Sequence, residues 1–324
     1  MKINFKLNSL ILLSTIILFA YGCTKPEYGY ADTSKKNNEA VKSETLSQIQ
    51  AVLSGSAPVI QRHIFPAVSG KVIVGQKGTR ITIAPNSFVH QNGQAVSGDV
   101  DFELQEIFDV GEMIGSGLTT TSEDKLLVSG GELYLNATQK GNPLKLASGS
   151  SLGIQVPSNN PDPQMKLFVG SGSPDSSNFD WQAINNPVQS CNDSITQFFG
   201  YCFDISQLFN YINCDYFQND PRPLTDVEIK VPATYNDTNT VVFIHVPSIN
   251  SIAKIYHYQN GSFWVDGGYK LPVGLSVNFV AVHKDVNGNM FYAYQSNTIA
   301  NSHVETLSFQ QVTVAQLQAF ISSL

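Results

Sequence analysis

Residues 99–107 read DVDFELQEI, and this stretch decides the fold class of the chain. Apolar residues and carboxylates alternate along it with a period of two, which is the pattern of a β-strand that buries one face and leaves the other in water. The apolar positions are Val100, Phe102 and Leu104, and the acidic positions are Asp99, Asp101 and Glu103. We therefore expect a body built of antiparallel sheets with polar outer faces.

The same strand carries one carboxylate in the inward register. Glu106 follows the spacing of the apolar residues, and a buried carboxylate needs a hydrogen-bonding or charged partner. Arg80 is one candidate partner, and we interpret this pair as structural. The three outward carboxylates do not predict a calcium site, because Ca²⁺ needs six to eight converging oxygens and side chains along one straight strand do not converge.

Further short strands flank this stretch at regular spacing. The expected strands are Lys71–Val74, Thr79–Ile83, Glu132–Ala137, Pro143–Leu146 and Leu152–Val156. Turn signals separate them at Asn92-Gly93, Gly130-Gly131 and Gly141-Asn142. Short strands with Gly and Asn turns between them are typical of an antiparallel sandwich, which we place at residues 67–157.

Four segments of this region resemble the ZU domain of netrin receptors, ankyrins and zonula occludens proteins, and more closely ZU-like modules of Bacteroidetes lipoproteins. The segments are Gly75–Phe88, Gly93–Asp109, Met113–Thr138 and Gly141–Leu146. The resemblance implies a β-sandwich that serves protein–protein contact. Some ZU-containing proteins cleave themselves at a His-Phe-Ser site, and because this sequence has no such tripeptide, self-cleavage is not carried over.

A second β-rich domain is expected at residues 191–324, after a Pro- and Gly-containing connector at 158–190. If Asn260-Gly261 forms a two-residue turn, Tyr258 pairs with Phe263 and His257 pairs with Trp264, with Tyr256 opposite Val265. Residues 314–322 predict a helix, with Thr313 as N-cap and Gln316 completing a capping box. The expected fold is therefore all-β, with two β-sandwich-like domains in tandem and a short C-terminal helix.

Two resemblances extend into this second half. The segment Phe209–Phe217, FNYINCDYF, is similar to an aromatic–Ile-Asn-Cys-Asp stretch of the same lipoprotein group. By order along the chain, the second domain corresponds to the UPA-type β-domain that follows ZU in the eukaryotic proteins, which is an analogy only.

Composition limits the class of protein. The chain has 324 residues, 42% of them hydrophobic and 14% charged, whereas soluble domains average about 25% charged residues. The formal net charge is −7. We expect no nucleic-acid partner, because phosphate binding needs a basic patch and no large Lys/Arg cluster is present.

The N-terminus predicts export. Met1–Lys6 is basic, and Leu10–Phe19 is an apolar run too short to span a bilayer, so residues 1–22 read as a signal peptide. Cys23 follows, in a setting that resembles the lipobox of bacterial lipoproteins and implies acylation of that cysteine, although Ala20 stands where the family usually has Leu. An ordinary signal peptidase site, with Ala20 and Gly22 as its small residues, is the alternative.

Residues 23–66 are expected to form a lipid-anchored tether. Thr24–Asn38 is polar and aperiodic. Glu44–Leu53 predicts a short helix whose apolar face rests on the body, because Leu46, Ile49 and Leu53 are spaced i, i+3 and i+7.

Candidate chemistry is sparse. Gly149–Gly153 matches G-x-S-x-G but continues into a strand, whereas a nucleophile elbow needs a following helix. No two of the six histidines lie within three to five residues of one another, so no zinc site is expected. His257, Trp264 and Tyr269 are candidates for an aromatic platform on which a sugar stacks, with core or edge-strand packing as the alternative interpretation.

Three cysteines follow the candidate lipid site. Cys191 and Cys202 are our expected disulfide pair, which leaves Cys214 buried and free. Ser194 lies in an Asp-Ser-Ile triplet that matches the short O-glycosylation site of Bacteroidetes.

These observations predict a non-enzymatic, exported lipoprotein on the outer membrane or cell surface, with no catalytic residues, no metal and no cofactor. We expect it to contact the membrane through its N-terminal lipid and to serve as a module for protein–protein or surface contact. The second hypothesis is a glycan-binding protein that uses aromatics around Trp264. A hydrolase is the third, and a cleft in which carboxylates converge with a His would favour it.

Overall fold

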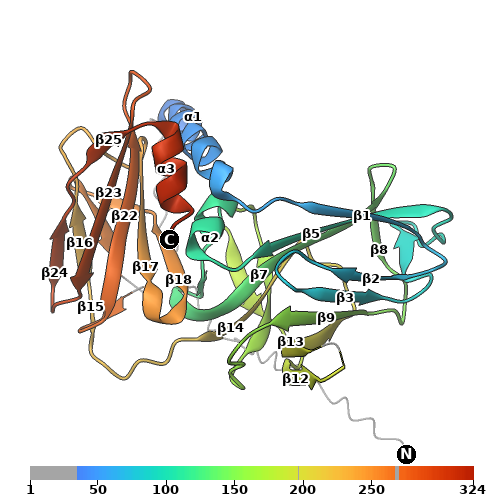
Figure 1. The fold of residues 1–324 in the computed structure, drawn as a ribbon. Coiled ribbons are helices and arrows are strands. Elements are labelled where there is room, and N and C mark those ends of the chain that lie inside the picture. Colours follow the sequence, from blue (N-terminus) through green and yellow to red (C-terminus); the bar gives the residue numbers. More distant parts are fainter. Residues whose placement is uncertain (1–34, 196, 267–269) are drawn as a thin grey trace, which may run out of the picture.

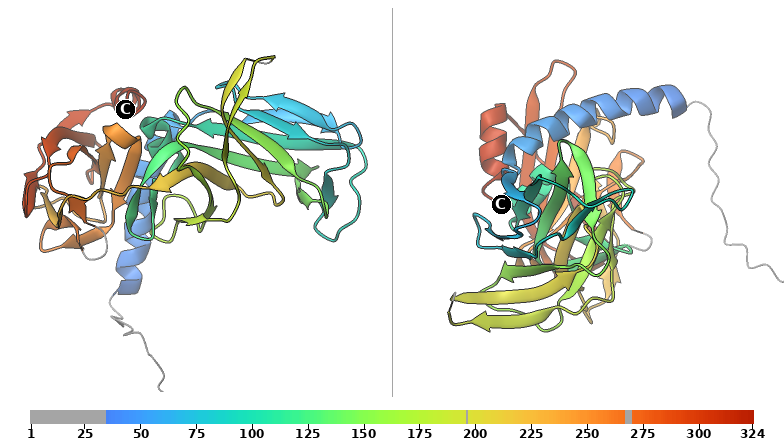
Figure 2. Two further views of the ribbon diagram at one scale, coloured as in Figure 1. Left: turned by 90° about the horizontal axis from the view of Figure 1, so that it is seen from below. Right: turned by 90° about the vertical axis from the view of Figure 1, so that its right-hand side faces the viewer.

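The computed structural model describes residues 35–324 except 196 and 267–269, with side chains described from residue 44 onward. Two β-modules lie side by side, and three helices pack where the modules meet (Figures 1 and 2). This arrangement confirms the expected all-β fold with a short C-terminal helix. No helix among the described residues has both the length and the apolar character needed to cross a bilayer.

The first module is a sandwich of two sheets. The larger sheet has the order β1 (Gln61–Pro66), β5 (Asp99–Ile107), β7 (Lys125–Gln139), β14 (Tyr211–Phe217), β10 (Lys166–Ser171) and β11 (Asp180–Ala183), with β4 (Phe88–His90), β6 (Thr121–Ser122) and β8 (Asn142–Leu146) attached. The smaller has the order β12 (Gln189–Asp193), β13 (Phe198–Ile205), β9 (Leu152–Pro157), β3 (Arg80–Ile83) and β2 (Lys71–Val74).

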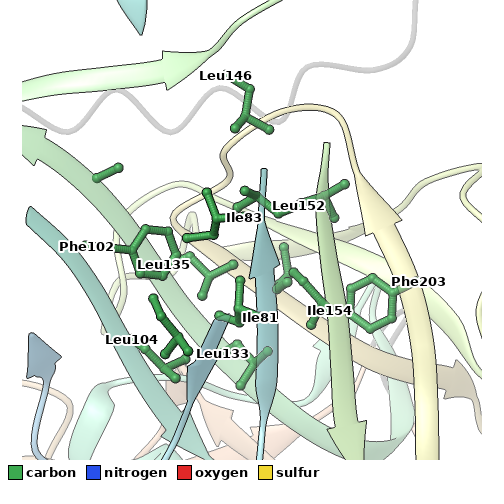
Figure 3. Packing of buried hydrophobic residues seen from close by; sticks show 14 of the residues in the cluster. Ile81, Ile83, Phe102, Leu104, Leu133, Leu135, Leu146, Leu152, Ile154 and Phe203 are labelled. Atoms are coloured by element: carbon green, nitrogen blue, oxygen red, sulfur yellow. The ribbon is translucent and has the colours of Figure 1, made fainter. Parts of the chain in front are cut away.

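The two sheets enclose one apolar core. Phe102 and Leu104 of β5 are fully buried and face Ile81 of β3 and Ile154 of β9 across the sandwich (Figure 3). The alternation of β5 therefore buries the face that its sequence predicts. The Gly130-Gly131 pair, expected as a turn, lies inside a continuous β7 and forms a β-bulge there, because the ladder with β14 shifts register at this point.

Glu106 is buried at the end of β5, and its partners differ from the expected Arg80. Its Oε1 accepts a hydrogen bond from the Thr79 amide (2.9 Å), and its Oε2 accepts from the Lys77 amide (2.8 Å) and Gln61 Nε2 (2.9 Å). The carboxylate holds the loop between β2 and β3 through backbone donors. Only glycine fits at position 75, because a Cβ there would lie 2.5 Å from the Glu106 carboxyl group.

The second module also pairs two sheets. One has the order β19 (His257–Gln259), β20 (Ser262–Val265), β16 (Val227–Lys230) and β24 (His303–Thr306). The other has the order β18 (Ser251–Ile255), β17 (Thr240–Val246), β22 (Ser276–Lys284), β23 (Met290–Thr298) and β25 (Gln310–Val312), and β15 (Leu224–Thr225) pairs with β21 (Leu271–Pro272). Every residue of β17 is buried, because one face meets the opposite sheet and the other meets the helices.

The expected hairpin at Asn260-Gly261 is confirmed. Both turn residues have positive φ (52° and 82°), as a type I′ turn requires. Tyr258 pairs with Phe263 and His257 with Trp264. The ladder with β20 begins at His257, so the predicted pairing of Tyr256 with Val265 does not form.

The helices form a shared core between the modules. They are α1 (Lys35–Leu53), α2 (Val110–Ser116) and α3 (Val314–Ile321), with the single turns η1 (Ser54–Ser56) and η2 (Pro247–Ile249). Ile49 and Leu53 of α1 are fully buried beside Leu317 of α3 and Trp181 of β11. The expected packing of the 44–53 helix on the body is confirmed, and the helix begins earlier, at Lys35, inside the segment expected to be tether.

The module boundaries given by strand pairing differ from the predicted ones. The first module begins at β1, inside the expected tether, and β10 and β11 lie inside the expected connector 158–190. Residues 191–217, assigned to the second domain, supply β12, β13 and β14 to the first sandwich. The physical reason is that β7 and β9 would otherwise leave open edges, and β14 and β13 satisfy their backbone hydrogen bonds.

Candidate functional site

A cleft of about 500 Å³ opens where the two modules meet. The first module contributes its β6–β7 turn and the segment before β11, and the second contributes the end of β18, β19 and β20. The lining residues are Thr121, Glu123, Asp124, Ser177, Asn178, Phe179, Asp180, Ala253, Lys254, Ile255, Tyr256, His257, Trp264 and Asp266. Pockets of this volume are the usual size for small-molecule ligands.

Two of the three platform residues lie in this cleft. His257 is exposed and Trp264 is half-buried, and their cross-strand pairing places both on the outer face of their sheet. The two rings do not belong to the core, since the inward residues of β20 are Phe263 and Val265. Because β19 is the edge strand of its sheet, packing on an edge strand remains the alternative to a ligand platform. Tyr256, which was not part of the predicted platform, is 44% exposed in the same cleft. Tyr269 lies outside the described residues.

Hydrogen bonds orient the two rings. His257 Nδ1 lies 2.8 Å from Asp266 Oδ1, which leaves the other ring nitrogen available to a ligand. The indole Nε1 of Trp264 donates to the Gln259 carbonyl (3.3 Å) across the hairpin. Lys254 Nζ lies 5.3 Å from the centroid of the Tyr256 ring, and Lys254 also forms an ion pair with Asp175. Because Lys254 belongs to the second module and Asp175 to the first, this ion pair links the two modules next to the aromatic side of the cleft.

Carboxylates from the first module face these rings. Glu123 and Asp124 form the two-residue turn of the β6–β7 hairpin, both at positive φ (49° and 58°), a backbone conformation that is strained for Glu. Asp180 accepts a weak hydrogen bond from the Glu123 amide (3.4 Å). Burial is the main cause that raises the pKa of Asp180, and the nearby charges of Glu123 and Asp124 raise it further. The three acids therefore gather at one wall of the cleft.

The arrangement suits a polar ligand with an apolar face. Aromatic rings offer flat stacking surfaces, while carboxylates and an imidazole offer acceptors and a donor for hydroxyl groups. Our sequence reasoning missed the acidic wall because Glu123 and Asp180 lie 77 or more positions from His257 along the chain. The only local signal was a Glu-Asp pair between two strand-forming segments.

The predicted covalent sites fall elsewhere. Cys191 and Cys202 form the expected disulfide, diagonally across the β12–β13 hairpin with their Cα atoms 5.9 Å apart. Cys214 is free and buried, as expected, and burial raises the pKa of its thiol well above the ordinary value. Ser194 is exposed in the turn after β12. Cys23 lies outside the described residues.

A second surface feature lies along one edge of the first sandwich. β1 pairs only with β5 and β2 only with β3 among the described strands, so both are edge strands. Exposed aliphatic side chains follow them, namely Val59, Ile60, Ile64, Val68, Val72 and Val74. Open strand edges with exposed apolar residues are typical of surfaces that pair with another chain.

Comparisons with known proteins give no family. No family model matches the chain, and no curated protein matches it. Among solved structures, the chain is similar to γ-CGTase from alkalophilic Bacillus clarkii, with 10% sequence identity and a TM-score of 0.21. The match covers 74% of this chain and 40% of that enzyme, so it spans about two fifths of the enzyme's length. A TM-score this low carries no argument about fold or activity.

Proposed function

We propose that the protein is a non-enzymatic, lipid-anchored binding protein of the bacterial envelope whose inter-module cleft binds carbohydrate. The accessibility of Trp264 and His257 in this cleft carries the proposal, since buried rings would have excluded it. The signal-like residues 1–22 support an envelope setting, where Cys23 provides the anchor.

Carbohydrate fits the cleft better than an apolar ligand. A pyranose has one face of C–H groups that stacks on an aromatic ring, and hydroxyl groups at its rim that donate to carboxylates. Trp264 and Tyr256 offer the rings, and Asp180 with Glu123 offers acceptors on the opposite wall. A lipid would leave these carboxylates desolvated without donors, which costs about 1–3 kcal/mol or more for each group.

The proposal is tested by glycan-array screening of the full chain in detergent, followed by calorimetric titration of the best oligosaccharide. Loss of one stacking ring removes about 1–2 kcal/mol, so Trp264→Ala should weaken binding about 5- to 30-fold. The matched control is Tyr294→Ala, which removes a 41%-exposed aromatic ring outside the cleft. Equal affinity in wild type and Trp264→Ala would exclude the cleft, and release of reducing ends would identify a hydrolase instead.

A second candidate function is protein contact through the β1–β2 edge. The exposed aliphatic residues on two open edge strands favour it, and it agrees with the contact role implied by the ZU resemblance. A photocrosslinking amino acid at Val72 or Val74 should give one discrete protein adduct in membranes, whereas the same residue at Val286, which is fully exposed in a loop of the second module, should give none. Identical adduct patterns at all three positions would exclude a specific edge partner.

A further inference from the structure

A buried polar cluster lies on the larger sheet of the first module, and its residues do not line the cleft. Glu132 of β7 and Asn213 of β14 are directly paired across the ladder, and Asp215 follows two residues after Asn213. All three are buried, with 1% exposure or less. Their cross-strand neighbours in the same row, Ile107 and Phe168, belong to the core between the modules, so the cluster points toward that interface and away from the sandwich core.

The cluster leaves four side-chain oxygens without a hydrogen-bond partner. Within it, Asn213 Nδ2 donates to Asp215 Oδ2 (2.9 Å). The unpartnered atoms are Glu132 Oε1 and Oε2, Asn213 Oδ1 and Asp215 Oδ1. An unpaired carboxylate taken out of water costs several kcal/mol, and nearly all buried polar atoms in native proteins have a partner. The Asn213 amide oxygen can only accept a hydrogen bond or bind a cation, so its partner is either a protonated neighbouring carboxyl group or a group bound between the three side chains.

Among the residues that the structure describes, no cationic side chain pairs with these carboxyl groups. No ion pair involves Glu132 or Asp215 in the described part of the chain. Burial, together with repulsion from Asp215, raises the pKa of Glu132 well above its ordinary value. Burial also raises the pKa of Asp215 to about 8, although the Ser129 hydroxyl and the Gly130 amide oppose this rise. Two adjacent carboxyl groups in this setting are stable when they are protonated or when a cation lies between them.

We propose that Glu132, Asn213 and Asp215 bind a hard divalent cation, with Ca²⁺ as the first candidate. The donor set consists of oxygens only, from two carboxylates and one carboxamide, which suits Ca²⁺ or Mg²⁺ and not zinc or copper. No group of three or more His, Cys, Asp and Glu side chains with metal-binding geometry occurs among the described residues, so backbone carbonyls or water complete the coordination. The β-bulge at Gly130-Gly131 bends β7 opposite the segment between Asn213 and Asp215, which changes the direction of the side chains there.

The site ties β7 to β14 at the inter-module core. Phe168 and Trp181 of that core lie on the next strands of the same sheet, so cation binding stabilises the surface on which α1, α2 and the second module pack. Glu132, Asn213 and Asp215 are not among the residues that line the cleft, so cation binding and carbohydrate binding are measured separately.

The test uses the full chain, treated with EDTA and then titrated with Ca²⁺ or Mg²⁺. We expect Ca²⁺ to raise the melting temperature by several degrees, purified protein to carry about one equivalent of metal by elemental analysis, and Tb³⁺ to give sensitised luminescence that Ca²⁺ displaces. Glu132→Gln and Asp215→Asn should abolish the Ca²⁺ response, whereas Glu103→Gln, on the outer face of β5, should retain it.

The outcomes are decisive even if the buried variants fold poorly, because the metal content and the Tb³⁺ signal are measured on the wild type. Absence of bound metal, of a Ca²⁺-dependent shift and of Tb³⁺ luminescence in the wild type would overturn the proposal and identify the cluster as a protonated pair. A Ca²⁺ response that persists unchanged in a folded Asp215→Asn variant would overturn the assignment to these residues.

Discussion

The replacement of Glu106 by Gln tests how a single buried carboxylate organises the first module. The Glu106 carboxylate accepts three hydrogen bonds, two of them from the amides of Lys77 and Thr79. Gln has the same shape but only one acceptor oxygen, so its NH₂ group must face a donor. Hydrogen bonds to charged groups contribute about 1.5–3 kcal/mol each, and the change removes one or two of them and adds a donor–donor contact.

We expect Glu106→Gln to lower the free energy of unfolding by about 3–5 kcal/mol. For a folding unit of about 150–250 residues, such as the first module, 1 kcal/mol corresponds to about 2–4 °C in melting temperature, so a fall of about 10 °C is expected. The assays are urea unfolding followed by fluorescence and differential scanning calorimetry. Amide hydrogen exchange should also quicken at Lys77 and Thr79, since both amides lose their acceptor.

Glu103→Gln is the matched control on the same strand. Its carboxylate accepts from Asn136 Nδ2 (3.0 Å) and lies 3.9 Å from Arg62 Nε, with a quarter of the side chain exposed. Surface pairs of this kind contribute about 0–1 kcal/mol, so its loss should be small. The reasoning is refuted if the two variants unfold at the same urea concentration, or if the Lys77 and Thr79 amides keep wild-type protection in Glu106→Gln.

Three further perturbations have defined outcomes. Reduction of the Cys191–Cys202 disulfide should lower the free energy of unfolding of the wild type by up to about 3 kcal/mol, which is the loop-closure contribution for a loop of this length. A Cys191→Ser/Cys202→Ser variant should be unaffected by the reductant. Equal sensitivity of wild type and variant to the reductant in a calorimetric scan would contradict the disulfide. Gly261→Ala should lower the free energy of unfolding by about 1–2 kcal/mol, measured by urea titration, because the φ of +82° is unfavourable for Ala. A Cβ there would meet no neighbouring atom, so the cost comes from the backbone alone. An unchanged free energy of unfolding would contradict the type I′ turn. The raised pKa of Asp215 makes the folded state bind more protons than the unfolded state, so in EDTA the free energy of unfolding should fall as pH rises from about 4 to about 8. Thermal melting measures this profile. A flat profile in the wild type, or an equal slope in Asp215→Asn, would contradict the prediction.

Local signals predicted the parts of this fold that depend on neighbours in sequence. The alternation in β5, the Asn260-Gly261 turn and the Thr313–Gln316 capping box all form as expected. Each rests on interactions within about ten residues, where side-chain periodicity and backbone sterics decide the conformation. The pairing of Cys191 with Cys202 belongs to the same class, because one hairpin brings them together.

Long-range pairing decided the rest. Nothing near Asn213 in sequence indicates that it lies opposite Glu132, or that β14 belongs to the first module. The acidic wall of the cleft likewise meets Trp264 only because the two modules pack through a common helical core.

The sequence by itself determined the strand-rich class of this protein, its turns, its helix at the C-terminus and the inward position of Glu106. Tertiary structure decided which strands share a sheet, where one module ends and which side chains meet in the cleft and in the buried Glu132 cluster. The physical reason is that a strand's period specifies which face is buried but not its neighbour. Neighbours are chosen by satisfying backbone hydrogen bonds and burying apolar area over the whole chain.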